Sequence, residues 1–242
     1  YQTEALQDEK VREAIAMGID KEGFTSVLLD GNGTAAAGPF PSSFAFGDDT
    51  VIAPGYDPEK ARELLEEAGW TDTDGNGYVD KNGKDLTLRW LTYPSRQELP
   101  LLAESVQSTL GDIGIKVEVN STANHLDVLQ RGDWDIYASA FVCAPTGDPE
   151  YFFTTHCLDS STHNRGGYHS DRLEELEAQM STTFDAEERA SLAVEMTQTI
   201  LDDNAFIFAS HLRMSIVSGE GVTGLEAHPC DYYEITVDLD KN

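Results

Sequence analysis

The stretch "LTLRWLTYPSRQELPLLAESVQSTLGDIGIKVEVNSTANHLDVLQRGDWDIYASAFV" (residues 86–142) decides the fold of this chain. In its first five residues, apolar side chains alternate with Thr87 and Arg89, which is typical of a strand. A helix is predicted next, because leucine and valine recur at intervals of four residues up to Leu110. The stretch therefore opens with a strand that leads into an amphipathic helix.

The rest of the stretch repeats this alternation. "IKVEV" at 115–119 reads as a second strand, "HLDVLQRG" at 125–132 as a short helix, and "WDIYASAFV" at 134–142 as a third strand. Because the connections are short, this order predicts an α/β fold with a mainly parallel sheet flanked by helices. Ligands of such sheets bind at the carboxyl ends of the strands, so we expect them near the segments that follow Tyr93 and Val142, and also after Asn120.

Helix and loop signals continue on both sides of this stretch. Asp8 is predicted to cap a helix whose buried face carries Val11, Ile15 and Ile19. Residues 31–56 hold five glycines and three prolines, which predicts an irregular excursion. This excursion is either a functional loop or a strap that packs its phenylalanines onto the body, and we favour the strap.

The same signals predict the remaining elements. They are a helix begun by Asp57 and Pro58 and ended by Gly69, two helices capped by Ser170 and Asp185, one or two strands at 205–218, and another strand at 228–239.

The composition excludes two classes of partner. Of 242 residues, 44 are acidic and 16 are basic, which gives a formal net charge of −28. Such a surface repels phosphate backbones and anionic lipid headgroups, so we expect neither nucleic acid nor a membrane surface as a partner. The acidic residues serve either solubility or a cationic partner. No apolar run approaches the ~20 residues that cross a bilayer.

Motifs that carry chemistry are few. The H-E-x-x-H, G-x-S-x-G and Walker signatures are absent from the sequence, so nothing in it argues for an enzyme. Its three cysteines, Cys143, Cys157 and Cys230, fit no zinc spacing. One pair of them could form a disulfide in an exported protein.

Four blocks of the chain resemble one protein family. "VREAIAMGID" (11–20) resembles the family's "VRxAIxxAID" helix, with Gly18 where alanine is commoner, and Gly38 and Pro39 resemble the "GP" that follows. Three more blocks follow in the right order: "YDPEKARELLEEAGW" (56–70), "WDIYASAFVCAPTGDPEYFF" (134–153) and "HNRGGYHSDRLEELEAQM" (163–180). On these blocks the chain is identified as a member of family 5 of the solute-binding subunits of ABC importers, which take up peptides, nickel and opines.

This resemblance implies a periplasmic-binding-protein type II-like fold. It places residues 1–242 in the second, carboxy-terminal lobe of a two-lobed protein, whose first lobe lies outside this chain. The ligand would sit between the lobes, and closure of one lobe on the other would trap it. The implied function is that of an extracytoplasmic subunit that delivers a small peptide or nickel, as a chelate, to a permease without catalysis.

The resemblance also implies the partners. They are ABC permease subunits and the ligand itself, with a monomeric protein that reaches the membrane only through a lipid anchor outside this chain. No cofactor is required, and nickel would be cargo. Two alternatives stay open: a ligand sensor or chaperone on the same fold, and a metal-dependent hydrolase.

The segment "FVCAPTGDPEYFF" (141–153) corresponds to the ligand-facing segment of the family. The resemblance makes Phe141, Cys143, Thr146 and Asp148 candidates for ligand contact. Asp148 would meet the amino terminus of a peptide, but the spacing is shorter than the "GDxxDP" of many peptide-binding relatives. Nickel-importing relatives carry a tryptophan near Phe141, and this chain departs from that pattern.

The following loop holds His156, Cys157, His163 and His169. Imidazole and thiolate suit nickel, and nickel binders of the family use a histidine on this loop. His163 is therefore the candidate for contact with nickel or its chelate, the alternative being a solvated histidine.

Two further residues of this loop are candidates. Arg165 could bond a ligand carboxylate bidentately, or it could pair with the surrounding acids. Tyr168 is expected to pack at the rim of the cleft.

The acidic turn "DTDGNGYVD" (72–80) resembles the start of a calcium loop. The ligands would be the side chains of Asp72, Asp74, Asn76 and Asp80 and the carbonyl of Tyr78. The twelfth position is Gly83, where an EF-hand requires a bidentate glutamate. The alternative is a tight turn, since Asp, Asn and Gly tolerate left-handed backbone and bond to their own main chain.

Overall fold

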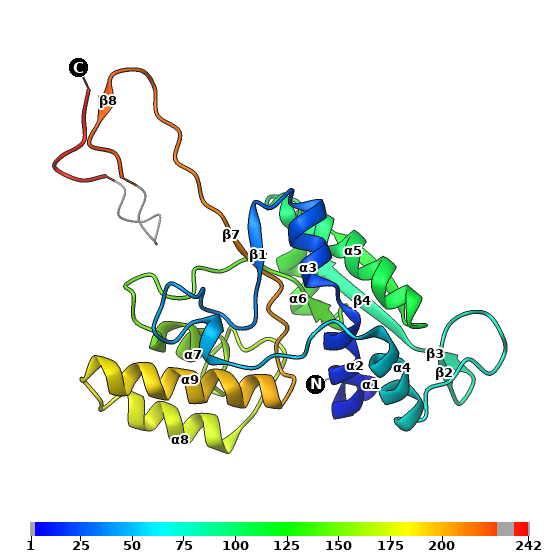
Figure 1. Ribbon diagram of the computed structural model, residues 1–242. Coiled ribbons are helices and arrows are strands. Elements are labelled where there is room, and N and C mark those ends of the chain that lie inside the picture. The colour runs from blue at the N-terminus through cyan, green and yellow to red at the C-terminus, as the bar shows by residue number, and fades with distance from the viewer. Residues whose placement is uncertain (1–2, 227–234, 242) are drawn as a thin grey trace.

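The computed structural model describes residues 3–226 and 235–241, and a three-stranded parallel sheet lies at its centre (Figure 1). β4 (Thr87–Thr92) lies between β5 (Lys116–Ser121) and β6 (Ile136–Tyr137) and is parallel to both. The predicted α/β fold with a parallel sheet is confirmed.

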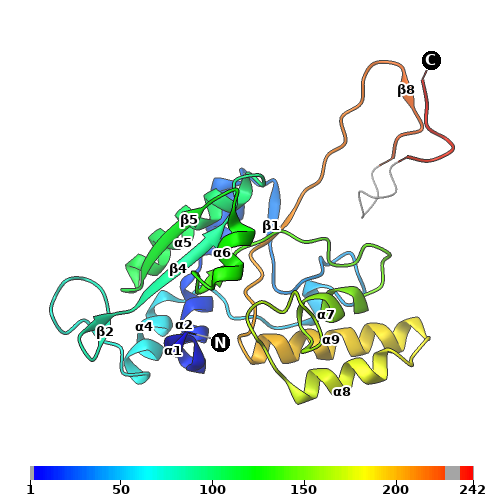
Figure 2. The same ribbon diagram turned by 180° about the vertical axis from the view of Figure 1, so that it is seen from behind.

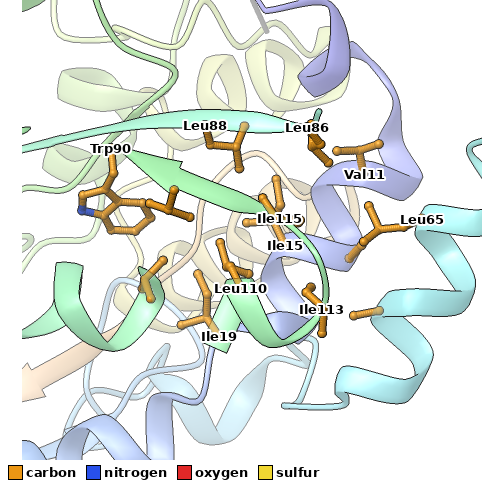
Figure 3. Close-up of a cluster of buried hydrophobic side chains, with 14 of the residues drawn as sticks. Val11, Ile15, Ile19, Leu65, Leu86, Leu88, Trp90, Leu110, Ile113 and Ile115 are labelled. Carbon is orange, nitrogen blue, oxygen red and sulfur yellow. The ribbon is translucent and has the colours of Figure 1, made fainter. Parts of the chain in front are cut away.

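One face of β4 carries the main core. Leu86, just before the strand, and Leu88 and Trp90 within it are at most 5% exposed, because alternate side chains of a strand point to the same face. Three helices cover this face: α2 (Glu9–Gly18), α4 (Pro58–Glu67) and α5 (Glu98–Asp112). Figure 3 shows the apolar side chains of these helices directed at the same cluster.

The helix starts follow the capping residues of the sequence. The side chains of Asp8, Asp57, Ser170 and Asp185 each accept a hydrogen bond from a backbone amide in the first turn of their helix. The predicted helix starts are therefore confirmed. Each cap involves only residues that are close together in the sequence.

The opposite face of β4 is covered by α6 (His125–Arg131). Leu91 of β4 packs there against Val128 and Leu129, with Trp134 and Tyr137 at the margin. The end of β4, from Trp90 onwards, is thus buried on both faces, and the strand is paired on both edges.

The third strand is shorter than the predicted 134–142. Its ladder is confined to Ile136 and Tyr137. Beyond it, the Thr92 hydroxyl donates a hydrogen bond to the Ala138 carbonyl at 3.1 Å, and the Ala140 amide donates to the Tyr93 hydroxyl at 3.2 Å. Side chains at the end of β4 therefore replace the backbone ladder.

A second hydrophobic core is formed by three helices that lie beside the sheet (Figures 1 and 2). It is built from α7 (Glu150–His156), α8 (Asp171–Met180) and α9 (Ala186–Asp202). Residues 31–56 insert Phe40 and Phe46 into it, with ring centroids 4.8 Å apart, and Phe44 packs at its edge. The prediction that this excursion is a strap is confirmed.

One segment contacts both cores. Phe206 and Phe208 pack against the second core, whereas Ile207 and Ala209 pack against the first. Of the strands predicted at 205–218, a ladder forms only at β7 (Ser210–Leu212), which pairs with β1 (Gly33–Ala35). Just before β7, the Ala36 amide donates a hydrogen bond to the Ala209 carbonyl at 3.3 Å.

The remaining elements are short. They are α1 (Glu4–Gln7), α3 (Lys21–Gly23), the π-helix η1 (Phe24–Leu28), the 3₁₀-helix η2 (Asp48–Thr50), the hairpin β2 (Asp80–Lys81) with β3 (Lys84–Asp85), and the pair β8 (Val222–Thr223) with β9 (Asp240–Lys241).

After β7 the chain leaves the body and extends away from it (Figures 1 and 2). The strand predicted at 228–239 lies partly outside the described residues, as does Cys230, and residues 235–239 form no strand. Among the described residues, no helix combines the length and the apolar character that spanning a membrane requires.

Gly18 lies where α2 meets α5. A Cβ atom there would stand 2.6 Å from Ile113 Cδ1 and 2.7 Å from Leu110 Cδ2, both in fully buried side chains. We expect Gly18→Ala to lower the free energy of unfolding by about 1–3 kcal/mol, because overpacking outweighs the gain in helix propensity.

Gly111→Ala in α5 is the matched control. Its Cβ would meet no atom within 4 Å, so stability should rise by about 0.5 kcal/mol through helix propensity alone. Urea unfolding of both variants checks this. A Gly18→Ala variant as stable as Gly111→Ala would contradict the tight contact.

Candidate functional site

Three aromatic rings gather at the carboxyl edge of the sheet. Tyr93 follows the last residue of β4, Tyr137 ends β6, and His125 begins α6. The His125 ring stacks on Tyr93, with centroids 4.3 Å apart at 26°, and lies 6.1 Å from the Tyr137 ring at 15°. The parallel topology brings these three positions together because strand ends and the following helix start share one edge.

Polar groups accompany these rings. The hydroxyls of Tyr93 and Ser139 share a hydrogen bond of 3.2 Å. The Nδ1 atom of His125 is buried and makes no hydrogen bond within the described residues. The sequence directed attention to the segment after Tyr93, but His125 and Tyr137 were missed. Their positions, at a helix start after a strand and at a strand end, were the available signal.

An open pocket of about 300 Å³ lies between the end of α6 and residues 161–165. Arg131, Trp134, Thr162 and Arg165 line it, together with apolar and amide groups of α6. Arg131 pairs with Asp133, Nε to Oδ2 at 3.0 Å. No carboxylate is among the lining residues, all of which belong to the described part of the chain.

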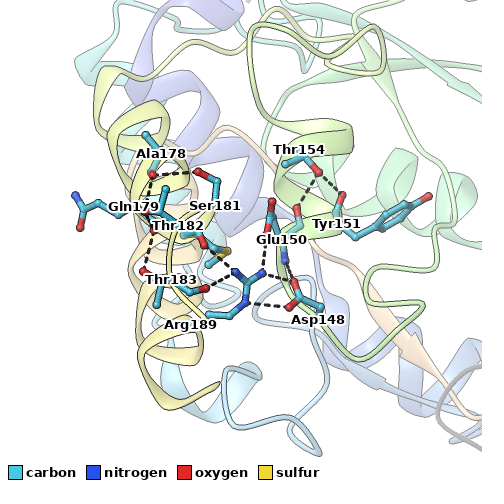
Figure 4. A network of polar contacts seen from close by, with 11 residues as sticks. Asp148, Glu150, Tyr151, Thr154, Ala178, Gln179, Ser181, Thr182, Thr183 and Arg189 are labelled. Atoms are coloured by element: carbon cyan, nitrogen blue, oxygen red, sulfur yellow. Dashed lines mark hydrogen bonds and ion pairs between the residues drawn. The ribbon is translucent and has the colours of Figure 1, made fainter. Parts of the chain in front are cut away.

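Asp148 is held by an ion pair with Arg189 of α9 (Figure 4). Arg189 Nε and Nη2 donate to the two carboxylate oxygens at 3.0 and 2.7 Å, and Nη2 also donates to Glu150 at 2.6 Å. Burial opposes ionisation of Asp148, but Arg189 and the Glu150 amide outweigh it and hold the pKa of this carboxyl below its ordinary value. The predicted contact of Asp148 with a peptide amino terminus stays a prediction that must compete with this ion pair.

The other candidates of the 141–148 segment differ in exposure. Phe141 is half exposed, and its ring packs on the His156 ring at 4.1 Å. Thr146 is exposed on the turn that precedes Asp148. Cys143 is half-buried against the second core. Of the candidates in this segment, Phe141 and Thr146 are therefore accessible to a ligand.

The two cysteines of this region are free thiols. Burial raises the pKa of Cys143 to about 12, and burial together with Cys143 raises the pKa of Cys157 well above its ordinary value. Cys157 is 1% exposed, so its thiol does not face a ligand that arrives from solvent. Contact of this thiol with nickel stays a prediction.

The histidines of the loop do not converge. His169 contacts Asp159 at 2.8 Å, whereas His163 is exposed and its ring lies 6.2 Å from that of buried His156. Contact of His163 with nickel stays a prediction, in which this chain would supply a single coordinating side chain. Tyr168 is buried, and its hydroxyl donates to Asp203 at 2.6 Å, so it packs in the second core instead of lining a rim.

The acidic turn at 72–80 brings carboxylates together. Ligand oxygens of Asp72, Asp74 and Asp80 lie within 4.8 Å of one another. The same side chains also bond their own loop: Asp72 accepts from the amides of Gly75 and Gly77, at 2.7 and 3.0 Å. The geometry fits both a calcium site and a self-bonded acidic turn.

Asn76 and Tyr78 of this turn are also bonded within it. The Asn76 side-chain oxygen accepts a hydrogen bond from the Tyr78 amide at 2.8 Å, and the Asn76 amide group donates to Asp85 at 3.2 Å. The Asn76 oxygen would have to divide its lone pairs between this amide and a metal ion.

Comparison with known proteins identifies the family. The family described as bacterial extracellular solute-binding proteins, family 5 Middle, matches residues 1–164. The chain belongs to this family. Both family 5 and this fold are those of the binding proteins of ABC importers, not of enzymes.

Relatives in family 5 bind different ligands. The chain is 27% identical to the oligopeptide-binding protein AppA of Bacillus subtilis (strain 168), over 96% of the chain and 44% of the relative. It is 26% identical to the nickel-binding protein NikA of Staphylococcus aureus (strain NCTC 8325 / PS 47), over 79% and 37%. The chain therefore spans less than half the length of these relatives.

Solved structures of family 5 proteins share the fold. Bacillus subtilis AppA in complex with a nonapeptide superposes with a TM-score of 0.79 at 24% identity, over 94% of this chain and 46% of that one. Staphylococcus aureus NikA in complex with Ni(L-His)2 gives a TM-score of 0.77 at 22% identity, over 92% and 46%. At such identities the likeness shows the fold alone.

The calcium prediction for this family 5 chain has a direct check. An ion that binds only the folded state stabilises it by mass action, so millimolar calcium should raise the Tm. Asp74→Asn should abolish the rise, and magnesium serves as the control ion. An unchanged Tm in millimolar calcium would show that the carboxylates serve only the turn.

His156 should make stability depend on pH. Burial, with smaller effects of His163 and Arg165, lowers the pKa of its imidazole to about 4. Between pH 6.5 and 4 the unfolded chain binds a proton here that the folded chain does not, so stability falls as the pH falls. The loss across this window is at most about 3 kcal/mol, and His156→Gln should remove it.

His169→Gln is the control of opposite sign. A hydrogen bond that His169 donates to the Asp159 carboxylate raises the pKa of His169, so its contribution is present at low pH and is lost as the pH rises through the folded pKa. Urea unfolding from pH 4 to 7.5 compares the variants. Parallel curves for the wild type and His156→Gln would refute the lowered pKa.

Proposed function

We propose that this chain is the second lobe of a two-lobed, extracytoplasmic solute-binding subunit of an ABC importer. It captures a small peptide or a nickel chelate against the first lobe and presents it to the permease. The observation that supports this most is the cluster of Tyr93, His125 and Tyr137, which lies at the sheet edge where ligands of α/β folds bind. The membership in family 5 supports the same assignment.

The mechanism is binding without catalysis. Closure of the lobes replaces the water around the ligand with the tyrosine hydroxyls, the half-exposed Phe141 ring and the Arg165 guanidinium. Aromatic faces receive the apolar parts of a ligand, and the polar groups orient it. His163 would contact a nickel chelate from its exposed position on the loop.

Both ligand classes have named precedents among the relatives. AppA is an oligopeptide-binding protein and NikA is a nickel-binding protein, and each aligns with more than three quarters of this chain. Within the described residues, the one group of three or more converging His, Cys, Asp or Glu ligands is the acidic turn, which precedes the amino end of β4 and not its carboxyl end. Nothing therefore favours a metal-dependent hydrolase.

The assignment implies permease subunits as partners and a monomer in solution. Attachment to the membrane would come from a lipid anchor outside this chain. With half of the enclosing surface missing, this lobe alone should bind its ligand weakly.

Calorimetry on the two-lobed protein tests the function. The probes are a random tetrapeptide mixture and nickel chloride with excess L-histidine. We expect saturable binding of one of them at micromolar concentrations, and no cleavage of the peptides by mass spectrometry. Cleaved peptides, or an absence of binding to both probes, would contradict the proposal.

A further inference from the structure

Arg165 differs from the other arginines of the chain. Most guanidinium groups are bonded to a carboxylate or a backbone carbonyl. Among the described residues, those of Arg96, Arg165 and Arg213 have neither a hydrogen bond nor an ion pair. Arg96 and Arg213 are exposed, whereas Arg165 is half-buried and lines the pocket beside α6.

The charged side chains that line this pocket have the opposite sign to the net charge of the chain. The protein carries 44 acidic residues against 16 basic ones, yet the pocket is lined by two arginines and by no carboxylate within the described residues. A half-buried guanidinium without a counter-ion has lost part of its hydration and gained no partner. An anion that entered the pocket would supply the missing partner.

The remaining walls suit a group that is anionic at one end. The Trp134 indole offers an apolar face, and the Thr162 hydroxyl offers a donor. Arg131 is already paired with Asp133, which leaves Arg165 as the principal cation of the pocket.

Arg165 also acts electrostatically on two aromatic residues outside the pocket. Burial raises the pKa of the Tyr137 phenol, and Arg165 is near enough to oppose that rise. Arg165 also contributes to the lowered pKa of His156, whose ring carries Phe141. The Arg165 guanidinium is therefore within electrostatic reach of Tyr137 and His156.

We propose that Arg165 forms the subsite that receives the carboxylate of the ligand. This inference rests on the proposed function and specifies its ligand chemistry. A guanidinium binds a carboxylate through two parallel N–H···O bonds, and Thr162 would donate a further bond. A peptide carboxyl terminus and the carboxylate of an amino-acid chelate of nickel share this group, so both ligand sources fit.

Matched acid and amide probes test the subsite on the two-lobed protein. One arm compares the random tetrapeptide mixture as free acids with the same mixture as carboxyl-terminal amides. The other compares nickel–histidine with nickel–histidinamide, each with excess chelator. In the arm that contains the ligand, the wild type should prefer the acid roughly 10- to 100-fold in Kd, which is the scale of a hydrogen bond to a charged group.

Variants assign the preference to the residue. Arg165→Ala should bring acid and amide to within about twofold, and Arg165→Lys should restore part of the difference, because lysine keeps the charge but not the fork. Arg213→Ala changes the net charge equally from an exposed position that does not line the pocket, and it should keep the full preference. The Tm of each variant verifies that it is folded.

The outcomes separate the two proposals. Equal binding of acid and amide by the wild type would overturn the subsite while leaving the binding function intact. An acid preference that survives in Arg165→Ala would place the carboxylate elsewhere. If the wild type bound none of the four probes, the proposed function and the subsite would both fail.

Discussion

The rest of the structure depends on the burial of β4. Both of its edges are paired, one face holds Leu88 and Trp90 beneath three helices, and the other face holds Leu91 beneath α6. A strand enclosed in this way cannot shift its register without exposing apolar side chains. The end of β4 is therefore held in one position. There the side chains of Thr92 and Tyr93 form hydrogen bonds with the backbone that follows β6.

The candidate site follows from that fixed end. Tyr93 positions Ser139 and Ala140 by hydrogen bonds, and its ring supports His125. The pocket of Arg165 lies at the other end of α6 from His125, where residues Thr162 and Arg165 of a loop approach the helix. Recognition by this chain would thus combine aromatic groups of the sheet edge with a cation from a neighbouring loop.

Local signals in the sequence were enough to predict much of the fold but little of the candidate site. Asp8 and Asp57 cap their helices through amides two or three residues away, so their roles are readable without tertiary structure. Asp148 pairs with Arg189, 41 residues away, and no local pattern announces such a partner. The short β6 likewise depends on side chains of a strand 46 residues earlier.

The segment at 205–209 has a thermodynamic consequence. Neighbouring side chains of one short stretch are buried in separate cores, Phe206 and Phe208 in one and Ile207 and Ala209 in the other. Loss of order in either core would remove half of the packing that holds this stretch, and so weaken its packing against the other core. We therefore expect the chain to unfold as one cooperative unit, in which a defect in either core lowers the stability of both.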